Sequence, residues 1–292
     1  MWTTITTYLL ILVGGLVRAS GAGLGCPDWP RCFGRWIPPS SSAELPPQFD
    51  PSLFNPTLMW TEYLNRLLGV TVGFLILATV VSAWRHHRHE PRILWSTVAA
   101  LLLTGFQGWL GGRVVAHELA AWIVTVHMIV ALVIVQLLLY ATVRTWRKTS
   151  GLLSPLISAL IVATMIQIGL GAQVRGAIDV ATDTGTGPNA ALASVGLVDH
   201  LHRNAAILVL AGVFLAVFVL RSKRRNEPTL LRWSYVTLGL AILQVALGIS
   251  MAYVSLEPPA QVAHLTIASL LLGAETILLL TSSSGSAAIG YS

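Results

Sequence analysis

Six residues in the first half of the chain recur in the second half, each 137 positions later. The pairs are Glu62 and Asp199, Asn65 and His202, Arg66 and Arg203, Gln107 and Gln244, Gly111 and Gly248, and His127 and His264. Carboxylate, imidazole and guanidinium groups can move protons, ligate a metal ion and hold an anionic ligand. A duplication that keeps these groups in register therefore predicts two related sites.

The pair His202 and His264 suits a haem, because two imidazoles can take the two axial positions of its iron. Arginines would neutralise the propionates, and the candidates are Arg18, Arg66, Arg175 and Arg203. Zinc is the competing metal, but it prefers a third or fourth protein ligand. For each arginine, the alternative is a side chain that only reaches from a membrane helix to the interface.

The first half departs from this pattern at Asn65, which stands where the second half has His202. A neutral carboxamide is a poor iron ligand, so His127 would bind a first-half haem alone and leave the opposite position open. An open position suits oxygen chemistry, whereas a doubly ligated iron suits electron transfer. Glu62 would handle protons beside it. The alternative is a decayed site, although an idle intramembrane charge costs about 2.5–3.5 kcal/mol.

The elements that must position these residues are membrane helices. Of the 292 residues, 54% are hydrophobic and 10% are charged, and the apolar residues form runs close to the ~20 residues that cross ~30 Å of hydrocarbon. The predicted spans are about 3–17, 62–83, 93–112, 122–143, 153–173, 200–220, 232–253 and 261–281. The sequence thus predicts an all-α integral membrane protein whose eight helices form two pseudo-symmetric four-helix bundles.

The basic residues predict the orientation. Of the 18 Lys and Arg, 11 lie in the links after the second, fourth and sixth helices, and the positive-inside rule places those links and both termini in the cytoplasm. The predicted sites then lie toward the outer side of a plasma or inner membrane. The net charge of +6 matches contact with anionic membrane lipid. No nucleic acid is implied, because the basic clusters lack an aromatic platform.

Two long links on the predicted outer side carry further signals. The first, about 19–58, holds Cys26 and Cys32, the only cysteines. On an oxidising side they could form a disulfide, which would serve either as a staple of the loop or as a redox pair. The second link, about 176–198, is typical of irregular, exposed chain. Residues 282–292 are rich in Ser and Gly and indicate a flexible tail.

Several motifs resemble those of haem A synthases. The stretch 14–34, Gly-Gly-Leu-Val-Arg-Ala-Ser-Gly-Ala-Gly-Leu-Gly-Cys-Pro-Asp-Trp-Pro-Arg-Cys-Phe-Gly, is similar to the first-helix and first-loop signature of that family. The other landmarks are Glu62-Tyr63-Leu64-Asn65-Arg66-Leu67-Leu68, Gln107-Gly108-Trp109-Leu110-Gly111-Gly112, His200-Leu201-His202-Arg203 and His264. The resemblance covers about residues 8–275, nearly the whole chain.

The resemblance implies an enzyme that oxidises the C8 methyl of haem O to a formyl group, giving haem A for terminal oxidases. Residues 1–148 would form the bundle that receives haem O near His127 and Glu62. It also implies haem O synthase and cytochrome oxidase assembly as partners, and a homo-oligomer stays open.

The second bundle, 149–281, would hold a permanent haem B on His202 and His264. Family members commonly carry histidine where this chain has Asn65. Two other classes of protein remain as alternatives: a b-type cytochrome or haem carrier that leaves the porphyrin unchanged, and a small-molecule transporter built from repeats.

Overall fold

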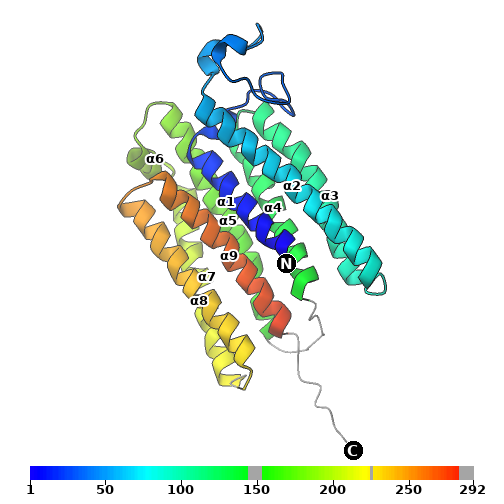
Figure 1. Cartoon of the computed structure of the whole chain (residues 1–292). Coiled ribbons are helices and arrows are strands. Elements are labelled where there is room, and N and C mark those ends of the chain that lie inside the picture. The colour runs from blue at the N-terminus through cyan, green and yellow to red at the C-terminus, as the bar shows by residue number, and fades with distance from the viewer. Residues whose placement is uncertain (144–152, 224–225, 283–292) are drawn as a thin grey trace, which may run out of the picture.

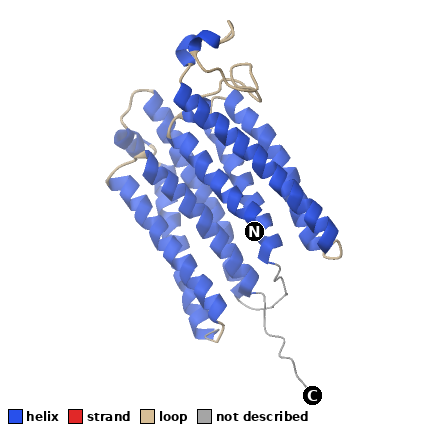
Figure 2. Cartoon of the chain, in the orientation of Figure 1, coloured by secondary structure: helices blue, strands red, loops and turns tan. Residues whose placement is uncertain are grey.

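The computed structural model describes residues 1–143, 153–223 and 226–282, and these residues form long helices (Figures 1 and 2). The helices of the first half are α1 (Trp2–Ala19), α2 (Pro56–His87), α3 (Pro91–Ala116) and α4 (Ala121–Val143). Those of the second half are α5 (Leu153–Asp183), the short α6 (Pro188–Ser194), α7 (Leu197–Lys223), α8 (Pro228–Tyr253) and α9 (Pro258–Ser282). Three 3₁₀ turns, η1 (Ala22–Leu24), η2 (Ser42–Glu44) and η3 (Pro51–Leu53), interrupt the first loop.

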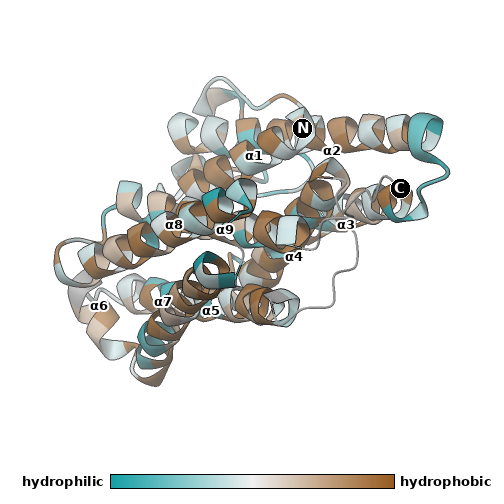
Figure 3. Cartoon of the chain, turned by 90° about the horizontal axis from the view of Figure 1, so that it is seen from below, coloured by the Kyte–Doolittle hydropathy of each residue, from teal (hydrophilic) through white to brown (hydrophobic). Residues whose placement is uncertain are grey.

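Eight of these helices, all except α6, are long and apolar enough to cross a membrane. Hydrophobic residues, drawn in brown, recur along all of these helices (Figure 3), and large hydrophobic side chains such as Phe74, Leu102 and Phe218 are exposed. An exposed apolar surface of this extent is favourable only in contact with lipid. The prediction of an all-α membrane protein with eight spans is confirmed for the described part of the chain.

The spans pack as two groups of four. In the first group α1, α2, α3 and α4 contact one another in chain order, and α4 returns to α1. In the second group α5, α7, α8 and α9 do the same, and α9 returns to α5. The groups meet where α1 packs on α9 and α4 packs on both α5 and α9, so that these four helices lie at the centre of the molecule (Figure 1).

The two ends of the molecule differ in composition. Residues 20–55 cover one end, which we call the loop end, above α1 and α2 (Figure 1). The opposite end, called the basic end, carries the α2–α3 turn with Arg85, Arg88 and Arg92. The basic residues at 144–148 and 224–225 lie outside the described residues, as does the predicted tail, 282–292, except for Ser282, which ends α9.

Two predictions about helix limits are wrong. The helix α2 begins at Pro56, six residues before the predicted start, because Asn55 caps it by accepting a hydrogen bond from the Leu58 N–H at 3.2 Å and Pro56 suits the first helical position. The segment 176–198 is mainly helical, since α5 continues to Asp183 and α6 follows. An apolar cluster that includes Val174, Ile178 and Ala191 holds this extension against α6.

Candidate functional site

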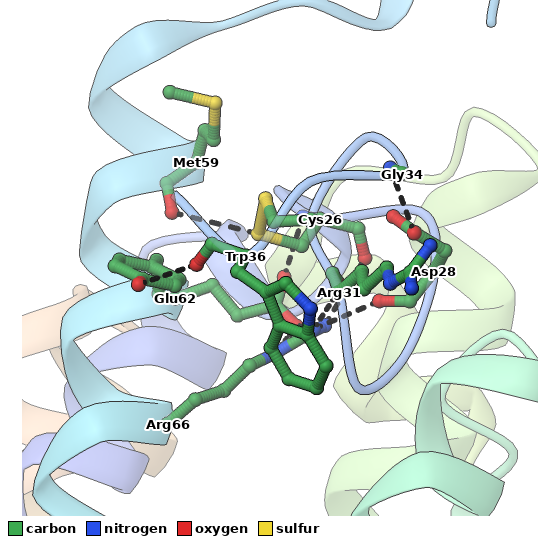
Figure 4. Close-up of a disulfide and its surroundings, with 10 residues drawn as sticks. Cys26, Asp28, Arg31, Gly34, Trp36, Met59, Glu62 and Arg66 are labelled. Atoms are coloured by element: carbon green, nitrogen blue, oxygen red, sulfur yellow. Dashed lines mark hydrogen bonds and ion pairs between the residues drawn. A yellow bond between two sulfur atoms is a disulfide. The ribbon is translucent and has the colours of Figure 1, made fainter. Parts of the chain in front are cut away.

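Glu62 and Arg66 lie one turn apart on α2 and face the first loop (Figure 4). The Glu62 side chain is only 5% exposed. It accepts a hydrogen bond from the backbone N–H of Cys26 at 2.8 Å and forms an ion pair with Arg66. The carboxylate predicted to handle protons therefore lies directly beneath the loop and is held there by two partners.

The Arg66 guanidinium has a protein acceptor for each of its five N–H groups. Nε and Nη2 donate to the Glu62 carboxylate. Nη1 donates to the carbonyl oxygens of Asp28 at 2.8 Å and Arg31 at 2.9 Å, and Nη2 also donates to that of Cys26 at 3.2 Å. A guanidinium has no further donors. The predicted role of Arg66 on a propionate would require some of these contacts to break, and it stays a prediction.

The loop beneath which Glu62 lies is closed by a disulfide between Cys26 and Cys32. Both cysteines are buried with Phe33 and Met59 in an apolar cluster. At Gly25 the loop approaches α2 so closely that a Cβ would lie 2.4 Å from the carbonyl oxygen of Leu58. The loop therefore packs as an ordered cap on the first group of helices.

His127 and Asn65 show what the first half offers a ligand. His127 lies near the loop end of α4, and its backbone carbonyl accepts a hydrogen bond from Gln107 at 2.9 Å. Within the described residues, neither Nδ1 of His127 nor Oδ1 of Asn65 has a hydrogen-bond partner, although both atoms are buried. Buried polar atoms without partners are rare in folded proteins and mark places where a ligand or water completes the bonding.

The second half carries two histidines that face each other. The ring centroids of His202 on α7 and His264 on α9 are 6.5 Å apart. Gln167 donates to the carbonyl oxygen of His202 at 2.8 Å, and Gln244 Nε2 lies 3.0 Å from His264 Nε2. Nδ1 of His264 is buried without a partner in the described chain.

The distance between the two rings fits a shared ion. Two imidazoles that bind one metal from opposite sides, each through a bond of roughly 2 Å, hold their centroids about 6 Å apart. A glycine also clears space beside one ring, because a Cβ at Gly171 would lie 2.9 Å from Cε1 of His202. Either ring nitrogen can serve as a ligand, so these residues fit a haem with two axial imidazoles.

Arg203 holds the position of Arg66 in the second half but has a different environment. Its side chain is 38% exposed, and it pairs with Asp199 at 2.7 Å and with the Tyr253 hydroxyl at 3.3 Å. No loop carbonyl among the described residues accepts from it. Arg203 therefore keeps N–H groups that could bind an anion such as a propionate.

The predicted arginines Arg18 and Arg175 meet on one carboxylate, that of Asp179. Oδ2 of Asp179 lies 2.5 Å from Arg18 Nη2, and Oδ1 lies 2.7 Å from Arg175 Nη2. The sequence analysis missed Asp179 because it lies in the stretch predicted as irregular chain. Its spacing of four residues from Arg175 would have indicated the ion pair had a helix been predicted there.

The family model described as cytochrome oxidase assembly protein matches residues 1–276. The chain belongs to this family. It is 28% identical to the haem A synthase of Allorhizobium ampelinum over 92% of the chain and 85% of that protein. It is 26% identical to the haem A synthase of Chelativorans sp. over 93% of the chain and 86% of that protein. The haem A synthase of Shewanella oneidensis is 34% identical over 49% of the chain and 43% of its own length.

The region matched by the family model includes every residue of the duplicated set, from Glu62 to His264. A cavity of about 410 Å³ lies apart from that set, between the basic ends of the first four helices. Thr3, Thr79 and Thr142 are among its lining residues. Its lining does not include His127, His202, His264 or Glu62, and we assign it no part in the site.

Proposed function

We propose that the protein is a haem A synthase, an oxidoreductase that converts the C8 methyl of haem O to a formyl group. The methyl would be hydroxylated twice, and loss of water from the resulting diol would leave the aldehyde. The observation that carries this proposal is the unequal pair of sites in a member of this family: two facing histidines in one half, and in the other His127, whose Nδ1 is buried without a partner in the described chain, as is Oδ1 of Asn65.

In the second half, His202 and His264 would hold haem B, and Arg203 and Arg175 would bind its propionates. When bound, haem B supplies one-electron transfer. The protein's own contribution is to fix both imidazoles: Gln167 Nε2 contacts the His202 ring at Nδ1, 3.1 Å away, Gln244 Nε2 contacts the His264 ring, and Gly171 leaves room for the ring of His202. Held in this way, the ligands need little rearrangement when the iron changes oxidation state.

In the first half, haem O would bind to His127 as substrate. Asn65 would not bind the iron, because a neutral carboxamide is a poor iron ligand, and would leave it accessible to oxygen. Glu62 would accept or deliver protons at its carboxylate as the methyl is oxidised, and Arg66 would keep that carboxylate in place. The catalytic residues of this proposal are His127, Glu62 and Asn65.

The orientation proposed here follows from charge. The basic end would face the cytoplasm and the loop end the outside of a plasma or inner membrane, which places the disulfide loop on the oxidising side. We also propose that haem O synthase supplies the substrate and that the product is passed on during oxidase assembly. In this arrangement both histidine sites lie near the outer surface.

The decisive experiment is to express the chain in a host that makes haem O but no haem A, and to extract and identify the pigments by mass spectrometry. Formation of haem A, together with a low-spin haem B in the purified protein, supports the proposal. Unchanged haem O beside bound haem B would instead indicate a b-type cytochrome or haem carrier. Absence of both pigments from the purified protein would overturn the assignment of the histidines.

A further inference from the structure

Asp179 joins the two halves of the molecule through one carboxylate. Arg18 belongs to α1 of the first group of helices, whereas Arg175 and Asp179 belong to α5 of the second. Each carboxylate oxygen contacts a different guanidinium, at 2.5 and 2.7 Å, and the side chain of Asp179 is 31% exposed. The two positively charged guanidinium groups thus lie close together because they share the one negative charge of Asp179.

Each of these arginines lies one turn from a position that belongs to a site. Arg175 follows Gly171 by four residues, and Gly171 lies against the ring of His202. Arg18 follows Gly14 by the same spacing, in the matching sequence of the first half. Arg175 therefore lies one turn from the second-half site, and Arg18 holds the matching sequence position on α1.

The contacts of α1 also bring Arg18 close to the second-half site. One turn before Arg18, a Cβ at Gly15 would lie 3.0 Å from the side chain of Leu265, the residue that follows His264. The helix that carries Arg18 thus packs directly against the residue that follows a proposed haem ligand. Within the described chain, Asp179 is the carboxylate that forms ion pairs with both Arg18 and Arg175.

We infer that Asp179 is a positioning residue that couples the two haem sites by sharing its carboxylate between Arg18 and Arg175. The inference rests on the proposed function, because it assigns propionates to both arginines. When haem O enters the first half, its propionate draws Arg18 away from Asp179. The carboxylate then pairs more fully with Arg175, and the positive potential beside the second haem decreases.

The sign of the effect follows from electrostatics. Reduced haem carries one more electron than oxidised haem, so a less positive surrounding lowers the reduction potential. Binding of haem O would therefore make the electron-transferring haem a stronger reductant at the moment when electrons are needed. By linkage, haem O must bind more tightly to the protein whose second haem is oxidised.

The test measures this coupling in the intact protein in nanodiscs. The midpoint potential of the low-spin haem is determined by redox titration with and without saturating haem O, in wild type, Asp179→Asn and Asp179→Glu. Glu44→Gln is the matched control, because Glu44 is an exposed carboxylate of the loop that pairs with one arginine only, Arg35 at 3.3 Å. Haem O affinity is measured separately with the second haem oxidised and reduced.

We expect wild type and Glu44→Gln to bind haem O about fivefold more tightly in the oxidised state, at the lower end of typical couplings. A fivefold ratio corresponds to a decrease of about 40 mV on loading, at 59 mV per tenfold for one electron. In Asp179→Asn the ratio of haem O affinity in the oxidised state to that in the reduced state falls to about one, while the low-spin haem stays bound. Asp179→Glu restores part of this affinity ratio.

A wild-type potential that does not change on loading, or a change that persists in Asp179→Asn, would overturn the inference and leave haem A formation untouched. Loss of the low-spin haem in Asp179→Asn would also overturn it, because Asp179 would then be needed to build the site. Failure of the wild-type chain to hold haem B or to form haem A counts against the proposed function instead.

Discussion

Arg66 and Arg203 occupy equivalent positions in the duplicated halves, yet they are used in different ways. Arg66 is buried against Glu62 and donates to three loop carbonyls, whereas Arg203 is more exposed and pairs with Asp199 and Tyr253. In the first half the arginine binds the ordered loop that caps the helices, whereas in the second half the arginine is accessible. The same sequence position therefore holds the first loop in one half, and in the proposed function it would bind an anion in the other.

Replacement of the histidines should give the largest difference between the two halves. His202→Ala or His264→Ala should remove at least about nine-tenths of the low-spin haem, because a single imidazole holds the iron weakly against exchange. His127→Ala should leave that haem in place. The measurement is the haem-to-protein ratio with the reduced optical spectrum. A normal low-spin spectrum in both second-half variants would remove these residues from the site.

Glu62 tests whether the first half carries the chemistry. Glu62→Gln preserves shape and an acceptor for the Cys26 N–H but cannot transfer a proton, so haem A formation should fall by about 10²-fold or more. The content of low-spin haem should not change. Pigment analysis over time measures the rate, with Glu44→Gln as the control carboxylate. Undiminished turnover would show that proton transfer runs through another group.

Asn65→His would make the first half resemble the second. The added imidazole could ligate the iron on the side away from His127, and haem A formation should stay within roughly tenfold of wild type, because family members commonly carry histidine at this position. A second low-spin signal should appear when haem O is bound. The opposite replacement, His202→Asn, provides the comparison and should lose low-spin haem. An Asn65→His protein without that second signal would mean that Asn65 does not face the substrate.

The glycines of α1 and α5 sharpen the comparison on a smaller scale. A methyl group at Gly171 would lie 2.9 Å from the His202 ring, whereas one at Gly14 would have nothing within 4 Å. Overpacking costs about 1–3 kcal/mol, so Gly171→Ala should weaken haem B retention by about fivefold or more. Gly14→Ala should leave it unchanged. Equal retention in the two variants, measured by transfer of haem to apomyoglobin, would contradict this packing.

The smallest effects are expected from exchanging the arginines for lysine. Lysine has three donors for the four acceptor atoms around Arg66, so Arg66→Lys leaves at least one acceptor unpaired and should lower stability by about 1–3 kcal/mol. Arg203→Lys is a change at an exposed ion pair and should cost less than about 1 kcal/mol. Thermal unfolding in detergent measures both. A larger effect at Arg203 would reverse the roles assigned here.

The sequence predicts the architecture well because apolar runs report directly on the lipid environment. It predicts helix ends poorly, because helices continue beyond the hydrocarbon. At 1.5 Å per residue, the 32 residues of α2 span about 48 Å, compared with ~30 Å of hydrocarbon. For the same reason Asp179 was missed, since it lies on a helical extension that hydropathy does not mark.

The duplicated polar residues could also be found from sequence, because their spacing is constant. The partners of Arg66 could not, because they are backbone carbonyl oxygens, which every residue possesses and no sequence pattern distinguishes. From the sequence, His202 and His264 could only be predicted to lie at the same depth on two helices, and that does not establish that their rings face each other. Their separation of 6.5 Å depends on how α7 and α9 pack through their neighbours.

The close approach at Gly25 restricts how this part of the chain can change during evolution. Any substitution there places a carbon 2.4 Å from the Leu58 carbonyl oxygen and must push the loop off α2. Cys26, the next residue, supplies the N–H that holds Glu62. A substitution at Gly25 would therefore displace the N–H group that holds the Glu62 carboxylate. We expect selection at Gly25 to be as strict as selection at Glu62 itself.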